Sequence, residues 1–260
     1  MVRDLIKEAE IEPVDVVVEA PVVVAPEHPT IDVDKWHPKT ETGKKVKAGE
    51  ITDLNQIFDK GLMIMEPEII DLLLPNAESE LVLVGQSKGK FGGGKRTIWR
   101  QTQKKTCEGN KPKFASVVII GNKDGYVGYG IGKSKETMPA REKAVKQAKV
   151  NMIRIKRGCG SWECSCAGSH SIPFKVNGRC GSVRIEILPA PKGSGLIMEK
   201  ECQKMLMLAG IKDVYSKATG QTGSKLNLIQ ACFSALKQLT SVRVLPEHIE
   251  KLGIVEGRNV

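Results

Sequence analysis

Three cysteines and a histidine lie within twelve residues near the middle of the chain, with glycines on both sides. Thiolate sulfur and imidazole nitrogen are the ligands of closed structural zinc sites, and glycines let the backbone turn around one ion. The alternative is that the thiols stay unpaired in a reducing compartment. We therefore consider a possible structural zinc but no required cofactor. The candidate ligands are Cys159, Cys164, Cys166 and His170, and Cys180 could replace one of them.

A second group of residues suits nucleic acid. Residues 88–113 carry nine lysines and arginines and one acid, Glu108, so the segment repels itself unless it meets an anion. Its glycines let a backbone approach phosphates, and its aromatic rings could stack on bases. The alternative is a solvated hairpin. The residues expected to contact RNA are Lys88, Lys90, Phe91, Lys95, Arg96, Trp99, Arg100, Lys104 and Lys105, together with Lys133, Lys135 and Lys192 elsewhere in the chain.

Two glycine motifs resemble nucleotide sites. The run 128–134 looks like a P-loop, but the glycine required five positions before Gly132 is replaced by Val127. Alternating glycines on a strand instead let another backbone, of protein or RNA, come close. The run 189–195 opens a predicted helix and could bind a nucleotide phosphate, an RNA phosphate, or simply turn the chain. No catalytic base or magnesium-binding carboxylate set accompanies it, so we predict that the protein is not an enzyme.

Composition agrees with a polyanionic partner. The 260 residues include 40 lysines and arginines against 30 acids, a net charge of +10. The exception is residues 1–34, whose nine acids, two bases and several prolines predict an extended arm that avoids RNA. Seven cysteines without a disulfide framework indicate a reducing compartment. No signal peptide or membrane-spanning stretch is recognisable, so a cytosolic protein is expected.

Hydrophobic periodicity then predicts an α+β fold in two parts. Short helices near 51–58 and 67–74 precede strands at 81–84, 114–120 and 126–131, and a further strand could begin over 97–101. A helix over 139–155 follows, and the order is summarised as β-β-β-α. Strands at 172–176 and 182–188, a helix over 196–209, a strand at 211–215 and a helix over 226–239 give β-β-α-β-α, with a turn at Asn177-Gly178. The predicted organisation is an arm and connecting segment (1–50), an RNA-binding α+β domain (51–157), a cysteine-rich linker (158–170), a second α+β domain (171–245) and a polar tail (246–260).

Several of these motifs, in this order, resemble one family. Residues 117–136, 170–173, 178–183, 188–195 and 209–214 are similar to the small-subunit ribosomal protein number five family over most of the predicted folded part. The cysteine-rich run 157–166 resembles the archaeal branch of that family. The acidic arm departs from the family pattern.

The resemblance implies a fold and a function. The fold is a double-stranded-RNA-binding-like β-β-β-α domain followed by a left-handed β-α-β domain, which some small-molecule kinases share. The function is that of a structural constituent of the small ribosomal subunit in the cytoplasm, which binds rRNA and supports subunit assembly, mRNA entry and decoding accuracy. The implied partners are rRNA, the neighbouring small-subunit proteins numbers four and eight, and incoming mRNA, but no membrane.

Two other functions compete with this one. A small-molecule kinase would use the glycine loop 189–195 and bind ATP. A free RNA chaperone would bind RNA outside the ribosome, and it differs from a subunit protein in not sedimenting with small subunits after a high-salt wash.

Overall fold

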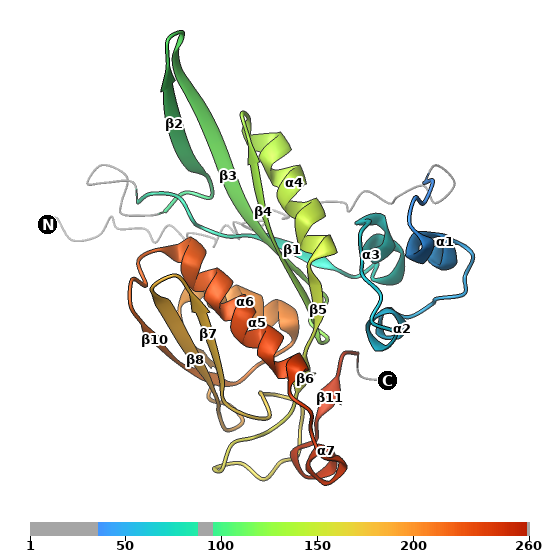
Figure 1. Ribbon diagram of the computed structural model, residues 1–260. Coiled ribbons are helices and arrows are strands. Elements are labelled where there is room, and N and C mark those ends of the chain that lie inside the picture. The colour runs from blue at the N-terminus through green and yellow to red at the C-terminus, as the bar shows by residue number, and fades with distance from the viewer. Residues whose placement is uncertain (1–35, 88–95, 259–260) are drawn as a thin grey trace, which may run out of the picture. The chain divides into compact units, whose positions relative to one another are not determined.

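Two larger sheets, one two-stranded sheet and the helices between and beside them make up the fold of the described residues (Figure 1). The computed structural model describes residues 36–87 and 96–258. The first sheet has the order β1-β3-β4-β5 with β2 paired to β3, and the second has the order β7-β8-β10-β9. The first sheet consists of β1 (Glu78–Leu81), β2 (Arg100–Thr106), β3 (Gly109–Gly121), β4 (Tyr126–Ser134) and β5 (Met152–Arg154), and the second of β7 (Val176–Cys180), β8 (Val183–Pro189), β9 (Leu196–Ile197) and β10 (Val214–Thr219).

The α+β class is confirmed. In the first part β2, β3 and β4 lead into α4 (Thr137–Val150), which gives the expected β-β-β-α order, and three short helices precede them. In the second part β9 and β10 pair in parallel through the connecting helix α5 (Lys200–Ala209), and α6 (Lys225–Ser241) follows. The short helices are α1 (Glu41–Lys47), α2 (Leu54–Asp59) and α3 (Glu68–Leu73), of which α1 lies in a stretch expected to be a plain connection.

Helix α4 lies directly on strand β4 because glycine alternates along that strand. A Cβ atom on Gly130 would lie 2.2 Å from the carbonyl oxygen of Ala144, and one on Gly132 would lie 1.8 Å from that of Ala140. The alanines on α4 are equally small and fully buried. Of the two explanations for these glycines, the close approach of protein backbone is therefore correct, and the run 128–134 is strand rather than a phosphate loop.

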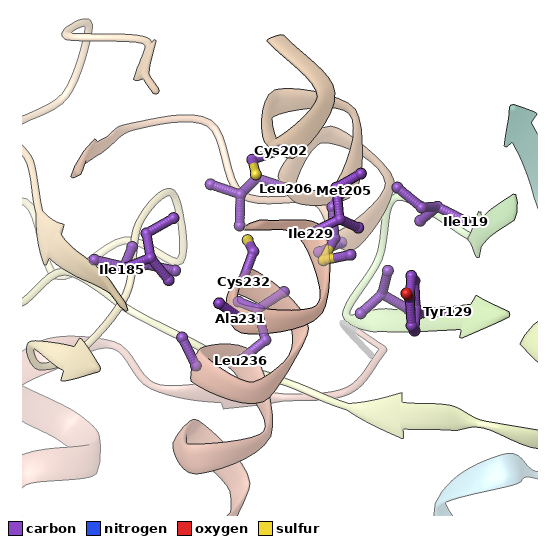
Figure 2. Packing of buried hydrophobic residues seen from close by; sticks show 14 of the residues in the cluster. Ile119, Tyr129, Ile185, Cys202, Met205, Leu206, Ile229, Ala231, Cys232 and Leu236 are labelled. Carbon is purple, nitrogen blue, oxygen red and sulfur yellow. The ribbon is translucent and has the colours of Figure 1, made fainter. Parts of the chain in front are cut away.

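The two faces of the first sheet bury different cores. The face toward α4 packs with α1, α2 and α3, through residues such as Val118, Ile57 and Ile70. The opposite face packs on α5, α6 and the second sheet, and Figure 2 shows Ile119 and Tyr129 beside Met205 and Ile229. Both sheets thus share one hydrophobic cluster.

The β2–β3 hairpin is much longer than the sequence indicated. Residues 102–113, predicted as part of a basic loop, form the outer half of two paired strands that project beyond the rest of the sheet (Figure 1). Their side chains are almost all exposed and polar, so hydrophobic alternation could not reveal a strand there. The strand expected at 81–84 instead pairs over 78–81.

Four expectations for the second part were wrong in position. The strand expected at 172–176 begins only at Val176 and runs to Cys180. Asn177-Gly178 is not a turn but lies inside β7. The glycine is needed there for packing, since a Cβ on Gly178 would lie 1.9 Å from the carbonyl oxygen of Ala231 in α6. The helix predicted from Leu196 begins at Lys200, since Leu196 and Ile197 pair with β10. The strand expected at 211–215 occupies 214–219.

Residues 246–256 are folded and do not form a polar tail. Helix α7 (Pro246–Leu252) begins with proline and ends at Gly253, whose φ of 55° is left-handed. Strand β11 (Val255–Glu256) then pairs with β6 (Lys156–Arg157), a short strand that follows β5. The long helix predicted over 139–155 ends earlier, at Val150, because Met152–Arg154 form β5 and pair with β4 at the edge of the first sheet.

Some expectations fall on residues that the structure does not describe. The acidic arm lies outside the described residues, and so do Lys88, Lys90, Phe91 and Lys95 of the basic loop. Within the described ranges, no helix combines the length and apolar character needed to cross a membrane.

The contact between α4 and β4 can be tested by adding one methyl group. We expect Gly130→Ala to lower the free energy of unfolding by about 1–3 kcal/mol, because the new Cβ meets backbone that cannot move away alone. Gly223→Ala is the control, since its Cβ would have no atom closer than 3.9 Å, and it should change stability by less than about 0.5 kcal/mol. Urea denaturation followed by circular dichroism measures both, and equal stabilities would contradict the packing described.

Candidate nucleic-acid interface and metal centre

One face of the β2–β3 hairpin carries most of its charge. The ladder runs without a bulge from Arg100, opposite Ala115, to Thr106, opposite Gly109. Side chains alternate between faces, and directly opposite residues share a face. The face that lies away from α4 therefore holds Arg100, Lys104, Lys111, Lys113 and, on β4, Lys133, whereas the other face holds only Lys105.

Like charges on this face stand directly opposite one another. Lys104 pairs in register with Lys111, and both side chains are exposed. Such a cross-strand pair destabilises a hairpin in water. Glu108 forms an ion pair with Lys111 at 2.6 Å, but both side chains are more than half exposed, so screening by solvent leaves the pair weak. The face is thus a row of cations that a single exposed acid compensates only weakly, and we call it the basic face.

Other predicted contact residues lie in different settings. Lys133 and Lys135 are exposed at the end of β4, beside the basic face. Trp99 is only partly exposed, and Arg96 donates to the backbone oxygen of Gly223 at 3.3 Å. Lys192 is exposed on the loop between β8 and β9, apart from the hairpin. No pattern of residue types separates Lys104 from Lys105, because only strand register assigns them to opposite faces.

The four candidate metal ligands come together. The sulfurs of Cys159, Cys164 and Cys166 and a ring nitrogen of His170 all lie within 4.8 Å of one another, a spacing that one ion could bridge. Cys164 Sγ lies 3.9 Å from Nε2 of His170. Cys180 ends strand β7 and is not part of this Cys/His cluster.

Backbone contacts fix the loop that bears the Cys/His cluster. Gly158 and Ser171 exchange backbone hydrogen bonds of 2.9 and 3.1 Å, which closes its two ends together. The Cys159 N–H donates to the Leu252 oxygen at 2.8 Å, so the end of α7 supports the loop. Gly253 approaches so closely that a Cβ there would lie 1.8 Å from the oxygen of Ala167.

The thiols differ in their electrostatic surroundings. Burial raises the pKa of Cys159 to about 11. A hydrogen bond from the Lys192 backbone N–H, followed by contacts with Cys166, lowers the pKa of Cys164 to about 6. N–H···S bonds of this kind stabilise a thiolate, which is the form that binds metal.

Asp213 orients the histidine. Its Oδ2 lies 2.7 Å from His170 Nδ1, and both side chains are nearly buried. A carboxylate accepts, so Nδ1 carries the proton and the lone pair of Nε2 points toward the sulfurs. Metal-binding histidines are commonly held by a carboxylate in this way, so the residues present fit a metal ion.

The same carboxylate occupies the glycine loop. Oδ1 of Asp213 accepts the backbone N–H groups of Gly193 at 3.0 Å and Gly195 at 2.9 Å. In a nucleotide-binding loop, backbone N–H groups like those of Gly193 and Gly195 would instead donate to a phosphate. The next helix, α5, begins five residues after Gly195 and is already capped by Glu199, whose side chain accepts from the Glu201 N–H at 3.0 Å. The loop is therefore bonded to an internal anion, and the nucleotide-phosphate interpretation of 189–195 does not fit.

Sequence reasoning missed Asp213 altogether. It follows the glycine of a helix end and looks like a surface acid, yet it joins the Cys/His cluster to the glycine loop. The support that α7 gives to the cluster was missed as well, although Pro246 and Gly253 are ordinary signals for the two ends of a helix.

Comparison with known proteins assigns both parts of the fold to one family. Residues 98–156 match the family model of the ribosomal protein S5 N-terminal domain, and residues 178–249 match that of its C-terminal domain. These ranges contain the basic face and the second sheet with its two helices.

Full-length relatives agree. The chain is 47% identical to the small ribosomal subunit protein uS5 of Nanoarchaeum equitans, over 87% of this chain and 97% of that protein. It is 48% identical to the protein of the same name from Methanocaldococcus jannaschii, over 87% of this chain and 98% of that protein. The corresponding protein of Methanococcus maripaludis strain C6 is 45% identical, over 87% of this chain and 93% of its own length.

Replacing Asp213 tests how the glycine loop is held. We expect Asp213→Ala to speed amide hydrogen exchange at Gly193 and Gly195 and to lower the free energy of unfolding by about 3 kcal/mol, because two N–H groups and a histidine lose a charged partner. Glu186→Ala, which removes an exposed carboxylate bonded to Lys175, should change stability by less than about 1 kcal/mol. Unchanged exchange at both glycines in Asp213→Ala would contradict this role.

Proposed function

The chain belongs to the ribosomal protein S5 family, as an archaeal-type member, and on this premise we propose that it binds folded rRNA of the small subunit through the basic face of the β2–β3 hairpin. The observation that carries the proposal is the row of Arg100, Lys104, Lys111, Lys113 and Lys133 on one face of the ladder. Phosphates would neutralise the repulsion between Lys104 and Lys111, which the exposed ion pair of Lys111 with Glu108 offsets only weakly.

Membership of this family makes the chain a structural protein of the small ribosomal subunit rather than an enzyme. Its place in the cell is therefore the ribosome in the cytoplasm. The occupied glycine loop agrees with this, because its Gly193 and Gly195 donors are already bonded to Asp213.

The finer parts of the function are proposals that rest on the family. We infer that the protein lies beside the small-subunit proteins numbers four and eight, near the path by which mRNA enters, and that it supports assembly and decoding accuracy. A hairpin of 13-residue β3 and 7-residue β2 suits such a position. Its outer half can reach into RNA while the rest of the first sheet and the second sheet stay outside. The remaining predicted contacts, Lys88, Lys90, Phe91, Lys95, Arg96, Trp99, Lys105, Lys135 and Lys192, are proposed as further RNA-contacting residues, of which Lys105 is expected to contribute least.

We also propose that the Cys/His cluster binds one structural zinc ion through Cys159, Cys164, Cys166 and His170. Three thiolates and one imidazole are a usual ligand set for zinc, and the carboxylate behind His170 supports the choice. The ion would hold the loop 158–170 to the glycine loop and to α7 without a large apolar core. No catalysis is assigned to it.

Charge reversal on the two faces of the hairpin tests RNA binding. Lys104→Glu should weaken binding to protein-free small-subunit rRNA several-fold and reduce the slope of log K against log salt by about 1, as expected for one lost phosphate contact. Lys105→Glu makes the same change of charge one residue away on the other face, so it is the matched control and should have a much smaller effect. Filter binding over a salt series measures both. Equal losses in the two variants would mean that the basic face does not direct binding.

Metal analysis of the purified chain tests the zinc proposal. We expect one zinc per chain in the unmodified protein and none that survives dialysis in Cys164→Ser, since three ligands bind zinc less tightly than four. Cys107→Ser and Cys180→Ser remove thiols outside the Cys/His cluster and should keep the ion. Absence of stoichiometric zinc from protein prepared without chelators would overturn the proposal.

A further inference from the structure

A cationic pocket lies at the far end of β3 from the hairpin tip. Its volume is about 900 Å³, and Lys123, Arg157, Lys192 and Lys212 line it. The one acid in the lining, Asp124, is bonded to Arg157 at 2.7 Å. Lys123 comes two residues after the end of 13-residue β3, so the pocket lies roughly 40 Å from the hairpin turn at about 3.3 Å per residue. The basic face therefore cannot account for this second concentration of positive charge.

The Cys/His cluster borders this pocket. Cys166 and His170 belong to its lining together with Gly168 and Ser169. Lys192 reaches it from the glycine loop. A pocket lysine therefore lies on the same cavity as two of the candidate metal ligands.

Trp162 projects from the loop of the Cys/His cluster. It is 92% exposed, the largest exposure among the large apolar side chains of the described residues. It stands in a tight turn closed by the Cys164 N–H, which donates to the Ser161 oxygen at 3.3 Å, and by the Glu163 N–H, which donates to Ser161 Oγ at 3.4 Å. Two cluster ligands, Cys159 and Cys164, flank it in sequence, so the ring is held out on a short, braced turn.

We propose that Trp162 and Lys192 form a second RNA-contact site, which takes a single-stranded segment. An unpaired base stacks on the Trp162 indole, and phosphates of the same strand lie against Lys192 and Lys212 at the pocket. Trp162 lies on the loop whose residues Cys166 and His170 line the pocket. An exposed aromatic ring together with cations is the usual combination for unpaired nucleotides, since bases in a duplex are already stacked. The inference rests on the proposed function in one respect, which is that the anionic ligand is RNA.

A protein partner would use these residues differently. An apolar pocket on another protein accepts any large apolar side chain in place of Trp162, whereas a base requires an aromatic ring. Charge also favours RNA. Of the four cations that line the pocket, Arg157 is paired with Asp124 and Lys123 with Glu78, whereas Lys192 and Lys212 form no ion pair among the described residues.

The test compares Trp162→Phe with Trp162→Leu in the full chain. Neither variant changes charge, and the side chain is too exposed to contribute much to folding. The probe is a fluorescently labelled 12-nucleotide oligo(A), with an RNA hairpin stem as the duplex control, and anisotropy gives the affinities. We expect Trp162→Leu to weaken oligo(A) binding by about tenfold, Trp162→Phe to keep most of it, and neither to change duplex binding. Lys192→Glu should weaken oligo(A) binding and lower its dependence on salt.

The outcomes separate this inference from the proposed function. If Trp162→Leu binds oligo(A) as tightly as Trp162→Phe does, stacking is absent and the inference is overturned, even when Lys104→Glu still lowers rRNA affinity. If both variants assemble into small subunits normally but Trp162→Asp does not, while oligo(A) binding is unchanged in all three, the turn contacts a protein and the inference is again overturned. If neither Lys104→Glu nor Lys192→Glu lowers the affinity for rRNA, the proposed function itself is contradicted.

Discussion

The close approach of α4 to β4 is the constraint on which the rest of the structure depends. Gly128, Gly130 and Gly132 leave no room for side chains between strand and helix, so this face of the first sheet is committed to α4. Since side chains alternate along a strand, the glycines also decide what the other face carries. That face presents Val117, Ile119 and Tyr129 to the second part of the fold, and farther along the same strands it presents the lysines of the basic face. The contact between α4 and β4 therefore decides which face of the first sheet carries the second hydrophobic core and the lysines of the basic face.

A second internal contact organises the opposite end of β3. Asp213 joins His170 of the Cys/His cluster to the N–H groups of the glycine loop, and Ser171 ties the same region together by donating to the Asp213 backbone oxygen at 2.5 Å. The loop resembles a nucleotide site in sequence because it keeps the glycines and the following helix. It differs in chemistry because a carboxylate of the protein itself takes the position that a phosphate would need.

The sequence predicted what depends on composition and short spacing. Clustered cysteines, buried strands such as 114–120, the Asp124-Gly125 turn and α6 all follow from local patterns, and the structure has each of them. It failed where exposed polar residues extend strands, as in residues 102–113 of the β2–β3 hairpin, and where a glycine serves packing rather than a turn, as at Gly178. Strand register assigns Lys104 and Lys105 to opposite faces, and long-range contacts make Asp213 part of the Cys/His cluster; neither can be derived from the residues alone.

A cryo-electron microscopy map of the small ribosomal subunit that contains this chain would test the central claim most directly. The account predicts rRNA phosphates within about 4 Å of the side chains on the basic face, with the α4 side of the hairpin largely free of them. A map in which Lys104, Lys111 and Lys113 face solvent or another protein, while RNA lies against the side that bears Lys105, would contradict it.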